Sequence, residues 1–405
     1  MTATERTTPL ERAAYYSLLA FAAMPQFSIA AAQILLGLTA LLWLILVTSR
    51  RERIEVPFMF WPLTAYAVAT LISSYFSIDP RASFWDSRQL LLFMIVPIAY
   101  RLLPGERSLK AIDVIITVGA LHAIYGIVQY GVMGDDINQR VQGVLGHYMT
   151  YSGVIMLVAC TAAARVMFRQ EDRVWSAIVM PALLVALALT LSRNAWVGAC
   201  AGIGTLLLLR DFRLIGLLPV AVGVFIALAP ATMTDRLYST FSLETLRQSD
   251  TSQATVQSNR DRIAMIRSGF RMVRDYPLTG VGPEMVIQVY PHYRDPEAIR
   301  QLNPHLHNVP LQIAAERGLP ALAMWLWFVV VLIRDFVRLR RKTAFPFVPT
   351  AGLAVVVAML AAGMFEHNFH DSEFLMLFLL LVTLPYAADS APLPTRAGAE
   401  QVRAA

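Results

Sequence analysis

Charged residues are scarce in this sequence, at only 15% of 405 positions. A soluble globular protein carries roughly 25%, whereas 57% of the residues here are hydrophobic. Apolar runs of about 17–25 residues recur along the chain, and each is long enough to cross a bilayer as a helix. Such helices satisfy their own backbone hydrogen bonds, which lipid cannot do for them. The composition excludes an ordinary soluble domain and predicts an all-α polytopic membrane protein.

Cysteine and lysine are also scarce, with two residues of each. Cys160 and Cys200 both lie in apolar runs, so we expect no disulfide and learn nothing of the redox compartment. The formal net charge is +6. In a soluble protein this charge would suggest nucleic-acid binding. In a membrane protein it is better explained by topology and anionic partners, so we expect no nucleic-acid partner.

The hydropathy pattern predicts about twelve spans, with both termini on one side of the membrane. The expected spans are residues 13–29, 30–48, 57–76, 89–101, 109–133, 151–168, 174–191, 194–209, 214–230, 319–333, 347–365 and 374–390. Basic clusters mark the cytoplasmic loops. These clusters are Arg50–Arg53, Arg101–Lys110, Arg169–Arg173, Arg210–Arg213 and Arg334–Lys342. An uncleaved first span is favoured over a cleavable signal peptide.

This orientation places one large polar loop, residues 231–318, on the outer side of the membrane. We expect a single membrane domain over residues 1–390, with that loop partly helical. Residues 391–405 are rich in Ala and Pro and are predicted to form a disordered cytoplasmic tail. A membrane protein with one such loop presents its chemistry at one face of the bilayer.

The outer loop begins with an arginine-rich segment, Asn259–Arg274, that is predicted to be an amphipathic helix. Its expected apolar stripe is Ile263, Ile266, Phe270 and Val273, and the arginines expected opposite are Arg260, Arg267, Arg271 and Arg274. Arg262 projects at the edge of the stripe. A half-buried arginine needs an anionic partner, so Arg262 is the best candidate here for binding substrate. An internal ion pair with Asp261 or Glu284 is the alternative.

A second candidate segment of the loop is Pro304–Gly318. Asn308 is a good helix N-cap and Pro310 is tolerated in a first turn, while Gly318 suits a helix end. His307 would then lie beside a helix N terminus, where exposed amides favour anions. A histidine there can act as a general base or as a hydrogen-bond donor.

A metal site is the alternative interpretation of the same histidines. His305 and His307 form an H-x-H pair, which is a weak metal signal without a third ligand. His292 or the pair His367 and His370 could supply one. We favour the interpretation without a metal.

Three more segments lie at the outer face. Arg193, within Leu191–Trp196, has apolar flanks, where a charge is a functional candidate by default; snorkelling to lipid headgroups is the alternative. Gly280 and Gly282 could bring backbone amides close to an anion. The segment Glu366–Asp371 is a candidate to line the same cavity.

Together these motifs resemble the bacterial O-antigen ligases and the related polymerases of the same superfamily of membrane glycosyltransferases. The resemblance rests on the segments His307–Gly318, Ser192–Trp196 and Pro277–Gly282 and on their order. It covers most of the chain, from about residue 60 to 385. One departure is that Ala321 and Ala323 replace glycines usual in the family.

The resemblance implies transfer of an O-antigen glycan from undecaprenyl pyrophosphate to the outer-core sugar of lipid A–core. The reaction would be inverting and metal-independent, without a cofactor, at the periplasmic face of the bacterial inner membrane. His307, Arg193 and Arg262 would be catalytic, and the substrate-binding residues would be Asn308, Arg267, Arg260 and His305.

The alternatives are an O-antigen polymerase, a protein O-oligosaccharyltransferase or a transporter. Polymerases of the superfamily tend to have two sizeable outer loops, whereas the second longest here, about residues 134–150, is short. A transporter should place ionisable groups near the membrane midplane, whereas the polar groups of this chain gather at one face.

Overall fold

The computed structural model describes residues 8–133, 140–169, 173–216 and 253–390, and these residues are predominantly helical. In chain order the elements are α1 (Pro9–Ala23), η1 (Met24–Gln26), α2 (Ile29–Arg50), α3 (Phe60–Tyr75), α4 (Pro80–Asp86), η2 (Ser87–Met94), α5 (Ile95–Leu102), α6 (Glu106–Met133), α7 (Tyr148–Phe168), α8 (Arg173–Leu189), α9 (Arg193–Arg210), η3 (Phe212–Gly216), α12 (Gln253–Asp275), α13 (Val286–Tyr293), α14 (Val309–Leu339), α15 (Phe347–Gly363), η5 (Asn368–His370) and α16 (Ser372–Asp389). The all-helical prediction is confirmed for this part of the chain.

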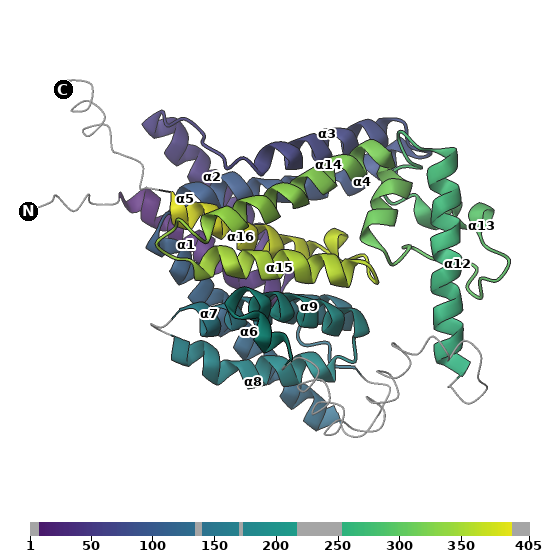
Figure 1. Cartoon of the computed structure of the whole chain (residues 1–405). Helices are drawn as coiled ribbons and strands as arrows, with labels where there is room; N and C mark the ends of the chain where they lie inside the picture. Colours follow the sequence, from purple (N-terminus) through teal and green to yellow (C-terminus); the bar gives the residue numbers. More distant parts are fainter. Residues whose placement is uncertain (1–7, 134–139, 170–172, 217–252, 391–405) are drawn as a thin grey trace, which may run out of the picture.

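The long helices form a bundle with chemically different ends. The start of α1 and the end of α16 lie at one end, which we call the terminal end, and α12 and α13 lie at the other, which we call the loop end (Figure 1). At the terminal end, Glu11 pairs with Arg50 at 2.9 Å and with Arg107 at 3.2 Å. Glu52 pairs with Arg101 at 2.7 Å. Basic residues assigned to the cytoplasmic side thus lie together at the end opposite α12.

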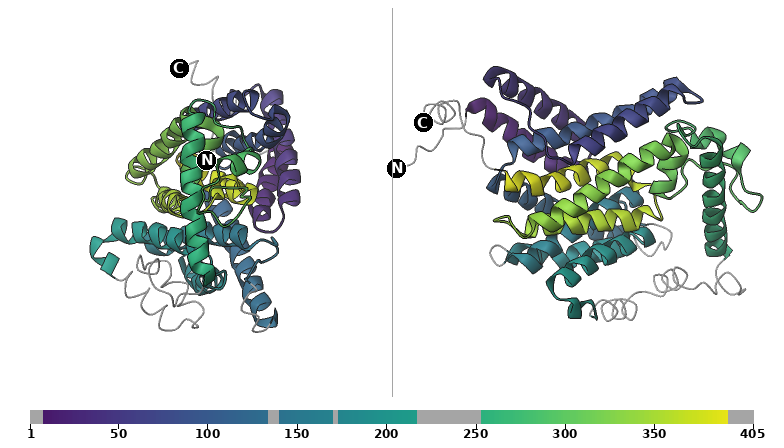
Figure 2. Two further views of the ribbon diagram at one scale, coloured as in Figure 1. Left: turned by 90° about the vertical axis from the view of Figure 1, so that its right-hand side faces the viewer. Right: turned by 45° about the horizontal axis from the view of Figure 1, so that its top comes forward.

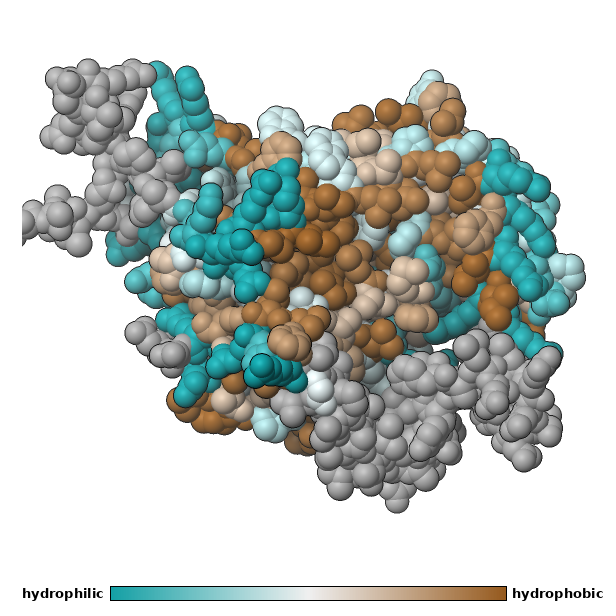
Figure 3. Space-filling view, viewed as in Figure 1, coloured by the Kyte–Doolittle hydropathy of each residue, from teal (hydrophilic) through white to brown (hydrophobic). Residues whose placement is uncertain are grey.

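Apolar side chains cover the bundle between these two ends. Five helices of the described chain, α2, α6, α7, α14 and α16, are long and apolar enough to cross a membrane, and α8 and α15 are shorter apolar helices. Figure 3 shows apolar atoms over the middle of the bundle and polar atoms toward both ends. This pattern is expected of a helical membrane protein.

Most expected spans coincide with helices, but twelve crossings remain a prediction. The expected fourth span is divided into the 3-10 helix η2 and the short α5. The span expected at 214–230 lies almost entirely outside the described residues, as do the tail 391–405 and the first part of the polar loop. Cys160 and Cys200 are free, as predicted.

Small residues let α9 and α15 pack closely and set their register. A Cβ at Gly202 would lie 2.9 Å from the carbonyl oxygen of Ala354, and one at Gly198 would lie 2.8 Å from that of Ala358. Small residues commonly allow such approach between helices in membranes. The pairing of Gly202 with Ala354 and of Gly198 with Ala358 shows that the two helices are antiparallel. About one turn before Gly198, the first residue of α9, Arg193, therefore lies level with the end of α15.

Helix α12 crosses the loop end of the bundle (Figure 2), and its buried face differs from the predicted one. Of the predicted stripe, Ile263, Ile266 and Phe270 are exposed, whereas Val273 is half-buried and packs against the core beneath α12. The buried face instead contains Asp261, Ala264, Met265, Ser268, Gly269 and Met272. Gly269 lies against Leu306 and Leu311, where a Cβ would come within 2.8 Å of both side chains. The face of α12 that is buried is therefore the one whose small residues allow close packing, and the isoleucine side chains lie on the exposed face.

The arginines and the apolar stripe also share the exposed half of α12, contrary to the predicted opposition. Counting about 100° per residue, Arg267 and Arg274 lie within about 40° of Ile263. The stripe is therefore bordered by positive charge.

Candidate active site

The local sequence fixes His307 at the beginning of α14. Asn308 is the N-cap, as predicted, and its side-chain oxygen accepts from the Leu311 amide at 2.9 Å. Its Nδ2 donates to the carbonyl oxygen of Met364 at 3.1 Å, which ties α14 to the end of α15. The preceding residue, His307, has φ +50°, a left-handed conformation that is uncommon for a residue other than glycine. Such conformations persist where surrounding structure enforces them and are concentrated at functional sites.

His307 forms a histidine–carboxylate pair with Glu366, which follows α15. Its Nδ1 lies 2.9 Å from Oε1 of Glu366, and the two side chains are 19% and 10% exposed. A carboxylate acceptor places the ring proton on Nδ1 and leaves the Nε2 lone pair to accept a proton. A base oriented by a third group is the arrangement that activates hydroxyl nucleophiles.

Three neighbours keep Glu366 ionised. Burial acts to raise the pKa of Glu366, but the hydrogen bond and charge of His307, the amide of His367 and the charge of Arg262 outweigh it and lower the pKa. The amide of His367 donates to Oε1 at 3.0 Å. Arg262 therefore acts electrostatically on the same carboxylate that orients His307.

The alternative ion-pair partners of Arg262 are engaged elsewhere in the described chain. Asp261 accepts from the amide of Ile299 at 2.7 Å, and the carboxylate of Glu284 lies 4.0 Å from His370. Arg262 itself is half-buried. The structure thus leaves a cation beside the His307–Glu366 pair, with its positive charge available to an anion.

The other α12 arginines have different surroundings. Arg267 pairs with Glu297 at 2.8 Å, and Arg271 pairs with Asp295 at 3.0 Å. Arg260 is exposed. These ion pairs tie α12 to the segment after α13, which gives Arg267 and Arg271 a structural role and favours Arg262 as the arginine that faces substrate.

Arg193 belongs to the same end of the molecule. It begins α9, whose N-cap is Ser192, and is half-buried. The α9–α15 register places its backbone level with the segment that carries Glu366. The three predicted catalytic residues therefore all lie at the loop end, on three different elements, and their roles remain predictions.

His305 and His367 form a neutral layer behind His307. Their rings are 5.1 Å apart, and the ring of His367 stacks on that of His370 at 5.1 Å. Burial lowers the pKa of His305 to about 4 and lowers that of His367 well below its ordinary value. A neutral His305 is suited to hydrogen bonding rather than to pairing with an anion.

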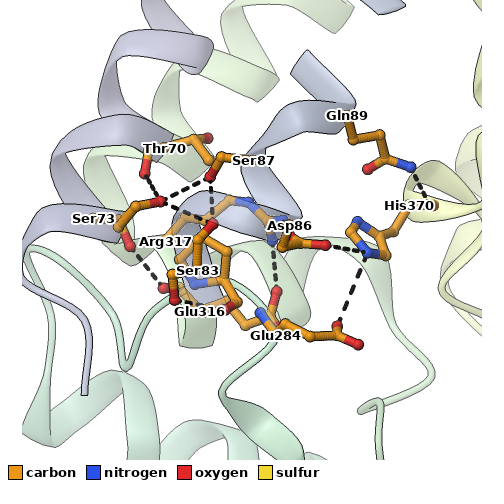
Figure 4. Close-up of polar contacts among 12 residues, drawn as sticks. Thr70, Ser73, Ser83, Asp86, Ser87, Gln89, Glu284, Glu316, Arg317 and His370 are labelled. Atoms are coloured by element: carbon orange, nitrogen blue, oxygen red, sulfur yellow. Dashed lines mark hydrogen bonds and ion pairs between the residues drawn. The ribbon is translucent and has the colours of Figure 1, made fainter. Parts of the chain in front are cut away.

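A second polar cluster lies beyond this layer (Figure 4), and we call it the anchor cluster. Its members are Asp86, Glu284, Glu316, Arg317 and His370. Arg317 donates to Glu316 at 2.6 Å and to Asp86 at 3.4 Å, and His370 Nε2 lies 3.1 Å from Asp86. A small cavity is lined in part by Asp86, Arg317, His367 and His370. The cluster joins α4, α14 and η5 under the candidate site.

The turn Pro277–Gly282 docks onto the kink of α14, and the two glycine amides predicted to face an anion are engaged: that of Gly280 donates to the carbonyl oxygen of Tyr276 at 3.0 Å. The amides of Val281 and Gly282 donate to the carbonyl oxygens of Ala315 and Glu316, both at 2.9 Å. Gly318 has φ +81°, and a Cβ there would collide with the carbonyl of Leu278. The predicted helix break at Gly318 is thus observed as a kink, and the turn fastens it rather than binding an anion.

One histidine–carboxylate group of the described chain has metal-ligand spacing. It consists of Asp86, Glu284 and His370, whose ligand atoms lie within 4.8 Å of one another. The H-x-H pair His305 and His307 is not part of it. Arg317 also contacts Asp86, and a neighbouring guanidinium disfavours a bound cation.

Sequence patterns predicted no specific role for Glu366 and did not single out Glu316 or Arg317. Glu366 was included only as part of an outer turn, because its contact with His307 depends on how α14 and α15 meet. The pair Glu316–Arg317 carried a usable signal, since adjacent charges precede a long apolar stretch and such charges within membrane helices have specific partners.

The fold and the charged loop end define a multi-pass helical membrane protein with its polar groups concentrated at one end of the bundle. Residues 177–326 match a family model described as O-antigen ligase. This segment contains Arg193, Arg262 and His307. This match supports the resemblance to the O-antigen ligase superfamily that the motifs predicted, and it supports a function of the ligase or polymerase type in general. No curated protein matched the chain.

Proposed function

We propose that this protein is an O-antigen ligase of the bacterial inner membrane. It transfers a glycan from undecaprenyl pyrophosphate to the outer-core sugar of lipid A–core, at the periplasmic face. The observation that carries this proposal is the His307–Glu366 pair beside Arg262. Such a site combines a proton acceptor with positive charge for a departing diphosphate.

The mechanism is a single displacement with inversion at the anomeric carbon. Nε2 of His307 takes the proton from the attacking core-sugar hydroxyl, and the new bond forms as the bond to the diphosphate oxygen breaks. Glu366 holds the ring tautomer and stabilises the imidazolium. His307 can alternatively orient the phosphate through a hydrogen bond.

Arg262 and Arg193 neutralise the leaving group. Negative charge grows on the diphosphate as the glycosidic bond breaks, and stronger pairing in the transition state raises the rate. Each charge-assisted hydrogen bond contributes roughly 1.5–3 kcal/mol. Asn308, Arg260 and His305 complete the proposed substrate-binding set; Arg267 was predicted to belong to it, but its charge is engaged by Glu297 at 2.8 Å.

The test is transfer by purified full-length protein from a lipid-linked glycan to rough lipopolysaccharide. Ligase activity yields glycan on lipid A–core, whereas polymerase activity yields a longer lipid-linked glycan and modifies no lipopolysaccharide. Absence of glycan from lipopolysaccharide would overturn the ligase assignment, and a longer lipid-linked product would identify a polymerase.

A further inference from the structure

His307 has a left-handed backbone, and the residues on both sides of it are held in place. Its φ of +50° is one that residues other than glycine rarely adopt, so the surrounding structure has to enforce it. On one side, Asn308 is fixed by its N-cap bond and by its bond to the end of α15. On the other side, the buried side chain of Leu306 packs against Gly269 of α12.

The side chain of Gln312, near the start of α14, holds the backbone amide of Leu306. Its Oε1 accepts from that amide at 2.7 Å, and the Gln312 side chain is fully buried. A buried amide that loses its acceptor costs more than the net value of an ordinary hydrogen bond. With the amide and the side chain of Leu306 both fixed, the backbone of His307 spans two anchored residues.

Glu316 determines which way the side-chain amide of Gln312 faces. Nε2 of Gln312 donates to Oε1 of Glu316 at 2.8 Å. Glu316 also accepts from the amide of Glu284 at 3.2 Å and from Arg317 at 2.6 Å. An ionised carboxylate is an acceptor only, so the nitrogen of Gln312 faces Glu316 and its oxygen faces Leu306. A chain of buried hydrogen bonds therefore joins the anchor cluster (Figure 4) to the segment that carries His307.

We propose that Gln312 is a positioning residue for His307. It holds the Leu306 amide, so that the ring of His307 meets Glu366 through Nδ1 and leaves Nε2 for the attacking hydroxyl. This inference rests on the proposed function and adds a residue that acts on the base through the backbone, whereas Glu366 acts on the ring itself. Because Gln312 is buried beneath the site, its loss should lower kcat and leave KM nearly unchanged.

The experiment measures kcat and KM of Gln312→Met with the glycan product that wild type forms. Methionine is unbranched and of similar length, but its sulfur is only a weak acceptor. We expect kcat to fall about tenfold, at the lower end of the scale for groups that orient a functional histidine. Gln312→Asn, which withdraws the side-chain oxygen from Leu306, should lower kcat in the same direction and provides the same test if Gln312→Met fails to insert.

Two comparisons separate positioning from general structural damage. In the His307→Ala background, Gln312→Met should leave the residual rate unchanged, because the base through which Gln312 acts is absent. The matched control is Gln26→Met. Gln26 is also fully buried, but its Nε2 donates to the carbonyl oxygen of Ile115 on α6, at 3.1 Å; its kcat should equal that of wild type.

Three results would overturn the inference. They are an unchanged kcat in the Gln312 variants, an equal loss in Gln26→Met, and a further loss when Gln312→Met is added to His307→Ala. A wild-type protein that transfers no glycan would instead overturn the proposed function.

Discussion

Two histidine–carboxylate pairs lie at the loop end, and they have similar distances but different surroundings. His307 meets Glu366 at 2.9 Å, and His370 meets Asp86 at 3.1 Å. His307 uses Nδ1 for its carboxylate, so Nε2 remains for a substrate proton. His370 uses Nε2, and its carboxylate partner also contacts Arg317.

The two pairs also differ in the arginine beside each of them, Arg317 for His370–Asp86 and Arg262 for His307–Glu366. Arg317 is buried and contacts both Glu316 and Asp86, so its charge is already compensated inside the protein. Arg262 is half-buried and acts on Glu366 without such a second partner in the described chain. We therefore expect Arg317 to anchor the structure, and we propose that Arg262 is the arginine that binds the anionic substrate.

The largest expected effect comes from removing the proposed base. His307→Ala should lower glycan transfer by about 10²–10⁴-fold, while the protein still folds and inserts. The measurement is the fraction of lipopolysaccharide that carries glycan in cells expressing equal amounts of protein. His292→Ala, which removes an exposed histidine of α13, is the control and should retain activity. Normally modified lipopolysaccharide in His307→Ala would remove His307 from the mechanism.

Replacing the orienting carboxylate should have a smaller effect. Glu366→Gln should lower kcat about 10–100-fold, the scale expected for groups that orient a functional histidine. KM should change less, because Glu366 acts through His307. Glu366→Asp should restore part of kcat. A variant that changes KM alone would argue that Glu366 binds substrate instead of positioning the base.

The ion pair of Asp86 with His370, in the anchor cluster, should affect the stability of the protein more than its rate of glycan transfer. Burial acts to raise the pKa of Asp86, but His370 and Arg317 outweigh it and lower the pKa. Burial acts to lower the pKa of His370, but Asp86 outweighs it and raises the pKa. The lowered pKa of Asp86 stabilises the fold above pH 3.8, its ordinary pKa, and this stabilisation is lost as the pH falls through the pKa of the folded state. The raised pKa of His370 stabilises the fold below pH 6.5, its ordinary pKa, and this stabilisation is lost as the pH rises through the pKa of the folded state.

The pair should therefore stabilise the fold most between pH 3.8 and 6.5. Asp86→Asn should lower Tm by on the order of 2 °C in that window, and the difference from wild type should shrink toward alkaline pH. Thermal unfolding in detergent across this pH range measures the difference. A constant Tm difference at every pH would show that the ion pair is not its cause.

The smallest expected effect is that of a chelator. Transfer should continue at its full rate in excess EDTA, because the proposed mechanism uses arginines to neutralise the diphosphate. The variant Glu284→Gln, which removes one possible ligand of the Asp86–Glu284–His370 group, should behave in the same way. A loss of activity that added divalent metal restores would assign that group a metal.

Local signals predicted much of the site from sequence. The N-cap at Asn308, the break at Gly318 and the helix around Arg262 follow from short-range chemistry. The buried face of α12 does not follow from such local signals, because it depends on the close contact of Gly269 with Leu306 and Leu311. The contact of His307 with Glu366 joins residues 59 positions apart, and the Arg317–Asp86 contact spans 231 positions. No local pattern predicts such tertiary contacts.

We propose that Arg262, beside the His307–Glu366 pair, holds the donor diphosphate. Equilibrium binding of a polyprenyl diphosphate to wild type, Arg262→Ala and Arg267→Ala tests it most directly. Affinity should fall by more than about tenfold in Arg262→Ala, the equivalent of one charge-assisted contact, and should change far less in Arg267→Ala. Undiminished binding by Arg262→Ala, or an equal loss in both variants, would contradict the account.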